Sequence, residues 1–86
     1  MESTEQTPER AFAEAQELAE TFASLLEVTP QRHGPEDNPY WHLPTVVAQR
    51  VFDIVIDATA TVRVDGTVLA TDIALASARA IAAQKQ

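Results

Sequence analysis

The stretch VFDIVIDATATVRVDG, residues 51–66, fits two structural periods at once. From Phe52 to Asp65 the even positions are apolar and the odd positions mostly polar, as in a strand with one buried face. The first half of the stretch also fits an amphipathic helix with 3.6 residues per turn. The choice between the two periods decides the fold and therefore the surface that is available for function.

A helical wheel separates polar from apolar residues in this region. One arc holds Gln49, Arg50, Asp53 and Asp57, and the opposite arc holds Val47, Val51, Phe52, Ile54, Val55 and Ala58. Pro44 suits the first turn of such a helix, where its missing N–H has no intrahelical partner. We therefore predict a helix over residues 44–59.

The helical pattern fails after residue 58, and the next segment leaves alternatives open. The residues TATVRVDGTV are β-branched and alternate around Asp65-Gly66, a strong signal for a two-residue hairpin turn. A short hairpin or a frayed turn over residues 60–70 is one prediction. The other is that the helix continues to Val64 and ends with Gly66 in a left-handed conformation.

The flanking segments predict two more helices. In residues 7–28, Thr7 can cap, proline suits position 8, and an apolar arc runs opposite a row of glutamates. Residues 71–84 form a weaker stripe of Ile73, Ala76, Ala80 and Ile81. Between the first two helices, four prolines in residues 29–43 predict a long loop.

These segments predict a mainly α fold: a small three-helix domain with a long Pro-rich loop between the first two helices and either a short hairpin or a turn over residues 60–70. We expect one domain over residues 1–86, with residues 1–6 disordered. At this length folding removes only about 60–65% of the surface of the unfolded chain, so the core is thin and a homodimer is expected. The chain has no cysteine, which excludes disulfides and thiolate sites.

Charge and hydropathy limit the environment and the partners. The chain has 13 acidic and 6 basic residues, a net charge of −7, and its arginines are scattered, so we expect no direct binding of nucleic acid. The N-terminus MESTEQTPER has no basic segment before an apolar run, and no stretch reaches the ~18 apolar residues of a membrane span. We predict a cytoplasmic protein.

Two groups of residues suggest catalytic or metal chemistry, and each has a simpler structural interpretation. His33, Glu36, Asp37 and His42 are ligand types within ten residues, but their spacing matches no known site and a Pro-rich loop does not preorganise ligands. Asp53 and Asp57 would lie one helical turn apart, on what resembles a solvated face. We predict no catalytic residues, no metal and no cofactor, and hence no enzyme.

The remaining features favour protein binding. Glutamates at 14, 17 and 20 line the back of the first helix, Tyr40 and Trp41 follow the prolines, and Leu75 lies beside the stripe of the last helix. An aromatic pair next to a helix is more often part of the core than a binding site. The predicted partner-binding residues are Glu14, Glu17, Glu20, Tyr40, Trp41, Asp53, Asp57 and Leu75.

Two hypotheses of different class follow. The first is a small, acidic, non-enzymatic interaction protein or accessory subunit that self-associates. The second is an inhibitor that mimics nucleic acid by presenting carboxylates in place of phosphates, as a phage anti-defence protein or an antitoxin would.

Overall fold

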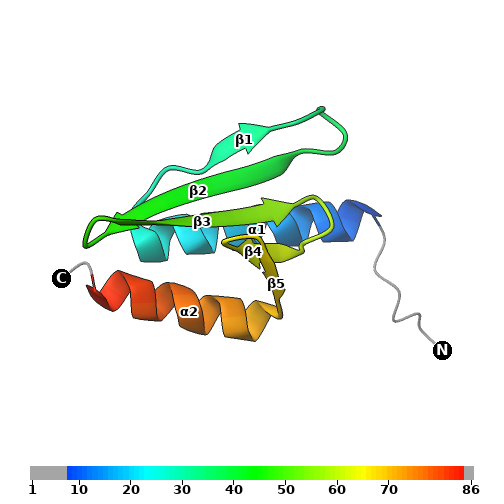
Figure 1. The fold of residues 1–86 in the computed structure, drawn as a ribbon. Helices are drawn as coiled ribbons and strands as arrows, with labels where there is room; N and C mark the ends of the chain where they lie inside the picture. Colours follow the sequence, from blue (N-terminus) through cyan, green and yellow to red (C-terminus); the bar gives the residue numbers. More distant parts are fainter. Residues whose placement is uncertain (1–7, 85–86) are drawn as a thin grey trace.

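The computed structural model describes residues 8–84, and within them it has two helices and five strands (Figure 1). In chain order these are α1 (Pro8–Leu26), β1 (Gln31–His33), β2 (Tyr40–Val47), β3 (Arg50–Asp57), β4 (Val62–Val64), β5 (Thr67–Leu69) and α2 (Thr71–Gln84). The disordered segment predicted for residues 1–6 and the cap predicted at Thr7 lie outside the described residues.

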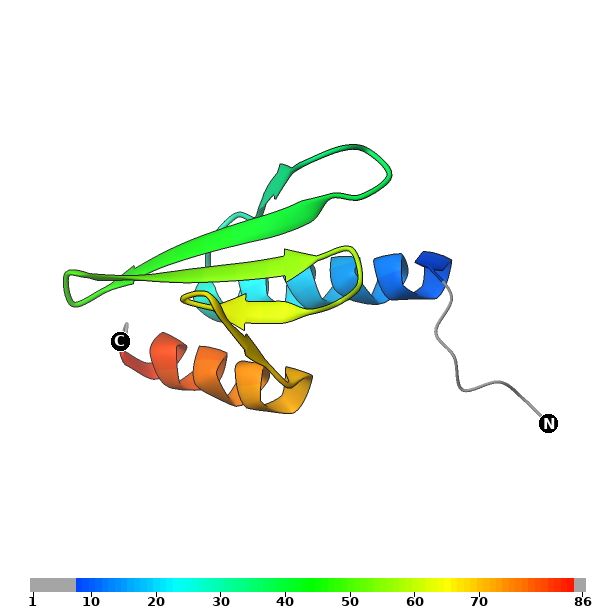
Figure 2. The same cartoon turned by 45° about the vertical axis from the view of Figure 1, so that its right-hand side comes forward.

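The strands form one antiparallel meander with the order β1-β2-β3-β4-β5. Both helices lie on the same side of this sheet, and the opposite side carries none of the described helices (Figures 1 and 2). The result is a two-layer α+β arrangement. The prediction of a mainly α, helical three-helix domain is wrong.

The predicted helix over 44–59 is in fact the β2–β3 hairpin. Along β2 the buried and less buried side chains alternate, with Trp41, Leu43, Thr45 and Val47 buried. In β3 the buried residues are Ile54 and Ile56. The alternation noted in residues 52–65 is therefore the correct period. It prevails because valine and isoleucine lose side-chain freedom in a helix, whereas in a strand they pack well against neighbours.

A tight turn at Ala48 and Gln49 joins the two strands. Their φ angles are 52° and 67°, and Val47 pairs with Arg50 across the turn. Two residues with positive φ between paired strands define a type I′ turn, which strongly favours Asn-Gly. Because Ala-Gln carries no such signal, the sequence did not reveal the turn.

Pro44 is compatible with β2 because of its place in the ladder. Hydrogen-bonded and non-hydrogen-bonded pairs alternate away from the Val47–Arg50 pair, so the Pro44–Asp53 pair is non-hydrogen-bonded. The nitrogen of Pro44 therefore points away from β3. On that side β1 pairs only with residues 40–42, so no ladder bond is lost there.

The other predicted connections are partly strands. The Pro-rich loop predicted for 29–43 contains β1 and the start of β2, and only residues 34–39 join the two. In residues 60–70 Asp65 and Gly66, with φ angles of 52° and 85°, form the two-residue turn between β4 and β5. Of the two alternatives for this segment, the hairpin is present and the continued helix is not.

The core lies between the sheet and the two helices. It contains alternate residues of the strands, the apolar arc of α1, and a row of small residues on α2. The buried row of α2 is Ala74, Ala78 and Ile81, whereas Ile73 is 54% exposed. The stripe predicted for this helix was thus rotated about the helix axis relative to the buried row. Alanines occur on every side of the helix, so the sequence distinguishes the buried side from the exposed side only weakly.

The substitution Gln49→Gly distinguishes the hairpin from a helix, because it should stabilise a turn residue with positive φ and destabilise a helical residue. We expect Gln49→Gly to stabilise the protein by about 1 kcal/mol, since it removes the strain of a side chain at positive φ. This would raise the melting temperature by about 4–8 °C. Thermal unfolding followed by circular dichroism measures it.

The matched control is Gln16→Gly on the exposed side of α1. The same substitution there should destabilise the protein by about 1 kcal/mol, because glycine is a poor helix former. A loss of stability of similar size from both variants would contradict the turn at residues 48–49.

Candidate functional site

The side of the sheet opposite the helices is the main candidate for a functional surface. We call it the open face and define it by the strand residues that alternate with the buried ones. Its members are Gln31, His33, Tyr40, His42, Pro44, Val46, Val51, Asp53, Val55, Asp57, Arg63 and Val68.

Several large apolar side chains of the open face are exposed to solvent. Val46 is 61%, Val51 54%, Val68 57% and Tyr40 40% exposed. Val46 and Val51 face each other across the β2–β3 hairpin, in a non-hydrogen-bonded pair where side chains approach most closely. They form a continuous apolar patch beside the Ala48–Gln49 turn.

The aspartates of the sheet each have a partner within the sheet. Nε2 of His42 lies 3.1 Å from Oδ1 of Asp53, and Nη1 of Arg63 lies 3.1 Å from Oδ2 of Asp57. At the β4–β5 turn, Arg50 is 3.6 Å from Asp65. Each of these carboxylates therefore lies within 4 Å of a histidine or arginine nitrogen.

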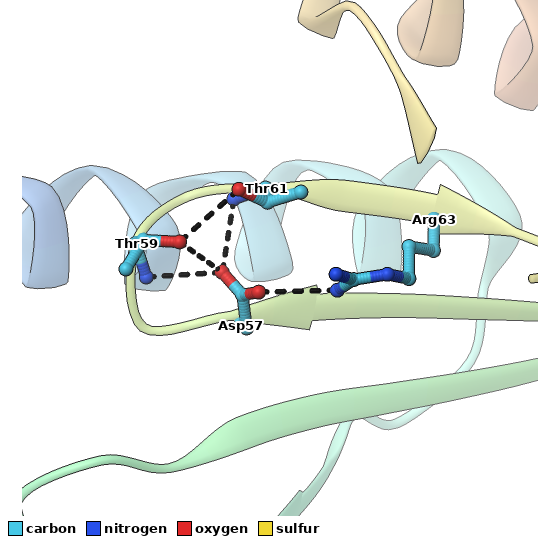
Figure 3. Close-up of polar contacts among 4 residues, drawn as sticks. All are labelled: Asp57, Thr59, Thr61 and Arg63. Atoms are coloured by element: carbon cyan, nitrogen blue, oxygen red, sulfur yellow. Dashed lines mark hydrogen bonds and ion pairs between the residues drawn. The ribbon is translucent and has the colours of Figure 1, made fainter. Parts of the chain in front are cut away.

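Asp57 organises the connection between β3 and β4 (Figure 3). Its Oδ1 accepts hydrogen bonds from the backbone N–H of Thr59 at 3.0 Å, the hydroxyl of Thr59 at 2.6 Å and the N–H of Thr61 at 3.1 Å. Its Oδ2 accepts one from Arg63 at 3.1 Å. With four donors around it, this carboxylate stabilises the turn and has little capacity left for a substrate.

These contacts also determine the acidity of Asp57. Partial burial raises its pKa, but the hydrogen bonds from Thr59, Thr61 and Arg63 outweigh burial and hold the pKa below its ordinary value. A carboxyl group that is ionised well below neutral pH is a poor general acid or base. The lowered pKa of Asp57 therefore indicates a structural role for this side chain.

Neither chemical group suggested by the sequence is assembled. Asp53 and Asp57 are four residues apart on one strand, about 13 Å along it, and not one helical turn apart. The rings of His33 and His42 lie 6.3 Å apart, yet residues 8–84 contain no group of three or more His, Cys, Asp or Glu side chains arranged to hold a metal ion.

Six of the eight predicted partner-binding residues lie on two separate surfaces. Tyr40, Asp53 and Asp57 belong to the open face, and the ring of Tyr40 stacks on His33 with centroids 5.3 Å apart. Glu14, Glu17 and Glu20 are exposed on α1, in the helix layer. The sequence hypothesis thus combined residues from two different surfaces.

Trp41 and Leu75 lie elsewhere. Trp41 is 6% exposed and its ring meets Phe12 edge-to-face, with centroids 5.7 Å apart. The guanidinium of Arg32 covers both rings at 5.7 and 5.8 Å from their centroids. Leu75 on α2 is half-buried against the core. Trp41 is therefore a core residue, and Leu75 offers only part of its side chain to a partner.

The sequence hypothesis missed the exposed valines of the open face. Val46, Val51 and Val68 were assigned to helix or hairpin, and none was chosen as a binding residue. The alternation of residues 52–65 could have found Val51, because it buries the even positions of β3. It could not have found Val46, since β2 buries the odd positions and the parity changes at the Ala48–Gln49 turn.

Comparison of the chain with protein-family models, with curated proteins and with solved structures gave no match. Neither α1 nor α2 is both long and apolar enough to cross a membrane, within the part of the chain that the structure describes.

The Asp57 network predicts a pH-dependent loss of stability. The pKa of Asp57 is depressed in the folded state. The contribution of the ionised side chain to stability is therefore complete at pH values above the ordinary pKa of aspartate, and it is lost as the pH falls through the folded-state pKa. Asp57→Asn should cost about 1 kcal/mol at pH 7. The difference in free energy of unfolding between Asp57→Asn and the parent protein should become smaller below about pH 4.

Urea unfolding at a series of pH values measures this effect. Asp37→Asn, a change in the exposed 34–39 connection, serves as the control and should stay within about 0.5 kcal/mol at every pH. An Asp57→Asn variant as stable as the parent at pH 7 would show that the network contributes nothing.

Proposed function

We propose that this protein is a small, non-enzymatic interaction module that binds a protein partner through the open face of its sheet. The observation that carries the proposal is the exposed apolar set on that face, with Val46, Val51 and Val68 each more than half exposed. Clusters of exposed apolar side chains on a small domain mark interaction surfaces more often than scattered single residues do.

The polar groups of the open face support a mainly apolar contact. The carboxylates of Asp53 and Asp57 already have His42 and Arg63 as partners, so a highly basic partner would have to compete for them. A partner with a largely uncharged surface avoids that competition. Desolvated apolar contacts at the centre and paired charges around them are typical of specific protein interfaces.

A second candidate function uses the other layer of the molecule. Glu14, Glu17 and Glu20 are all exposed on α1 at intervals of three residues, which brings them close together along one side of the helix. Such a row favours the alternative proposal, an inhibitor that occupies the nucleic-acid site of its partner. Its binding would weaken steeply with salt, since exposed charges are screened over ~8 Å at physiological ionic strength.

Site-specific cross-linking distinguishes the two surfaces. A photoreactive amino acid would replace Val51 on the open face, Glu17 on α1 or Ile73 on α2 in the full chain, expressed in cells of its native host. Val51 and Ile73 have the same exposed fraction, 54%, so Ile73 is a matched control for apolar exposure. We expect a defined protein adduct from position 51 and none from position 73.

The alternative predicts a different pattern. If the acidic row binds the partner, the adduct forms from position 17 and is lost when Glu14 and Glu20 are changed to lysine. Adducts from position 17 or 73 without one from position 51 would contradict binding through the open face.

A further inference from the structure

We infer that the partner of the open face is a second copy of this chain, packed sheet against sheet with the two helix layers on the outside. This inference rests on the proposed function and identifies the partner of the same surface. It follows from the distribution of charge, from the apolar patch, and from the size of the sheet.

The negative charge of the chain is concentrated away from the open face. The sheet carboxylates of Asp53, Asp57 and Asp65 are each within 4 Å of a histidine or arginine nitrogen. The other carboxylates of residues 8–84 lie on the helices, just after α1 and in the 34–39 connection: Glu9, Glu14, Glu17, Glu20, Glu27, Glu36, Asp37 and Asp72. The strands and the β4–β5 turn contain as many arginines, Arg32, Arg50 and Arg63, as carboxylates, so the sheet layer has almost no net charge.

Charge therefore favours one arrangement of two copies. Two chains with a net charge of −7 each repel one another, and the repulsion is least where the acidic helix layers of the two copies are farthest apart. Contact through the open faces places a sheet from each copy between the two acidic α1 helices. Two packed sheets are ~10 Å apart, and each helix lies a further layer outward, so the rows are separated by more than a Debye length of ~8 Å.

The open face is also suited to a two-fold contact. In such a contact both copies use the same patch, so the patch must be complementary to itself across the two-fold axis. A patch of like charges would repel its own copy, whereas the Val46–Val51 pair is apolar and the carboxylate of Asp53, two residues along β3, is hydrogen-bonded to His42. Valines from two inner faces interdigitate in the same way as in a β-sandwich core.

The size of the sheet sets the expected strength. β2 and β3 have eight residues each, about 26 Å at ~3.3 Å per residue, and five strands ~4.8 Å apart span about 19 Å. The face thus measures at most about 500 Å² in projection, below the ~800 Å² per partner of a standard interface. We expect a dimer that dissociates in the micromolar range.

Sedimentation equilibrium of the full chain from about 1 to 500 μM tests the inference. We expect a monomer–dimer equilibrium, and an increase in Kd of about tenfold or more for the double variant Val46→Lys, Val51→Lys. Ile73→Lys is the control, because it places a lysine, one added charge instead of two, at an apolar residue of α2 that is as exposed as Val51. Its Kd should stay within about twofold of the parent.

Two further measurements keep the result interpretable. If the lysine variant is not folded by circular dichroism, the variant Val46→Thr, Val51→Thr replaces it, since threonine keeps the shape and strand preference of valine. It should still weaken the dimer by about threefold. Raising the salt concentration from about 50 to 500 mM should tighten the dimer several-fold, because salt screens the repulsion between the acidic helices.

Each outcome decides the inference. A monomer at 500 μM, a dimer weakened more by Ile73→Lys than by the valine changes, or a dimer that dissociates with added salt would overturn it. The proposed function fails separately: if position 51 cross-links to a different protein while the chain is a monomer, the open face is an interaction surface and only the second copy is excluded as its partner.

Discussion

The burial of alternate residues of β2, together with Ile54 and Ile56 of β3, beneath the two helices is the constraint on which the remaining structure depends. Leu43 and Ile54 face each other directly in the register of the hairpin, and both are fully buried. A slip of one residue would turn the whole buried set toward solvent. The two-residue turn at Ala48 and Gln49 prevents that slip, because its length determines which residues of β2 and β3 are paired.

The chain builds its tight connections with few glycines. Within residues 8–84, five residues other than glycine have positive φ: Glu27, Ala48, Gln49, Ala60 and Asp65. Glu27 follows α1, where Val28 N–H donates to the carbonyl of Ala23 at 3.1 Å and closes the helix end. Ala60 ends the connection after Asp57. The surrounding pairings must supply the energy that holds these residues in left-handed conformations.

The two sides of the molecule differ in chemistry as a result of this architecture. Residues that are adjacent in the sequence alternate between the core and the open face along the strands. Ile54 is therefore buried in the core, whereas the neighbouring Asp53 lies on the open face. The acidic row of α1 lies in the helix layer and the exposed valines lie on the sheet. A surface with little net charge thus forms on a strongly acidic chain, away from the acidic row of α1.

The sequence by itself determined the features that depend on neighbouring residues. The amphipathic α1, the span of α2 and the Asp65–Gly66 turn follow from caps, helical periodicity and a favourable dipeptide, all of which act within a few residues. The tertiary structure decided the helix or strand state of residues 44–57 and, with it, the open face.

The physical reason is that residues 44–57 satisfy both periods locally, so their state depends on partners distant in sequence. As strands, they bury Val47, Ile54 and Ile56 in the core between the sheet and the helices, and Ile54, Val55 and Ile56 pair with β4. Those long-range contacts, added to the strand preference of valine and isoleucine, select the hairpin. Val46 and Val51 become a common exposed patch because the chain reverses at Ala48–Gln49, a turn that neither residue type signals.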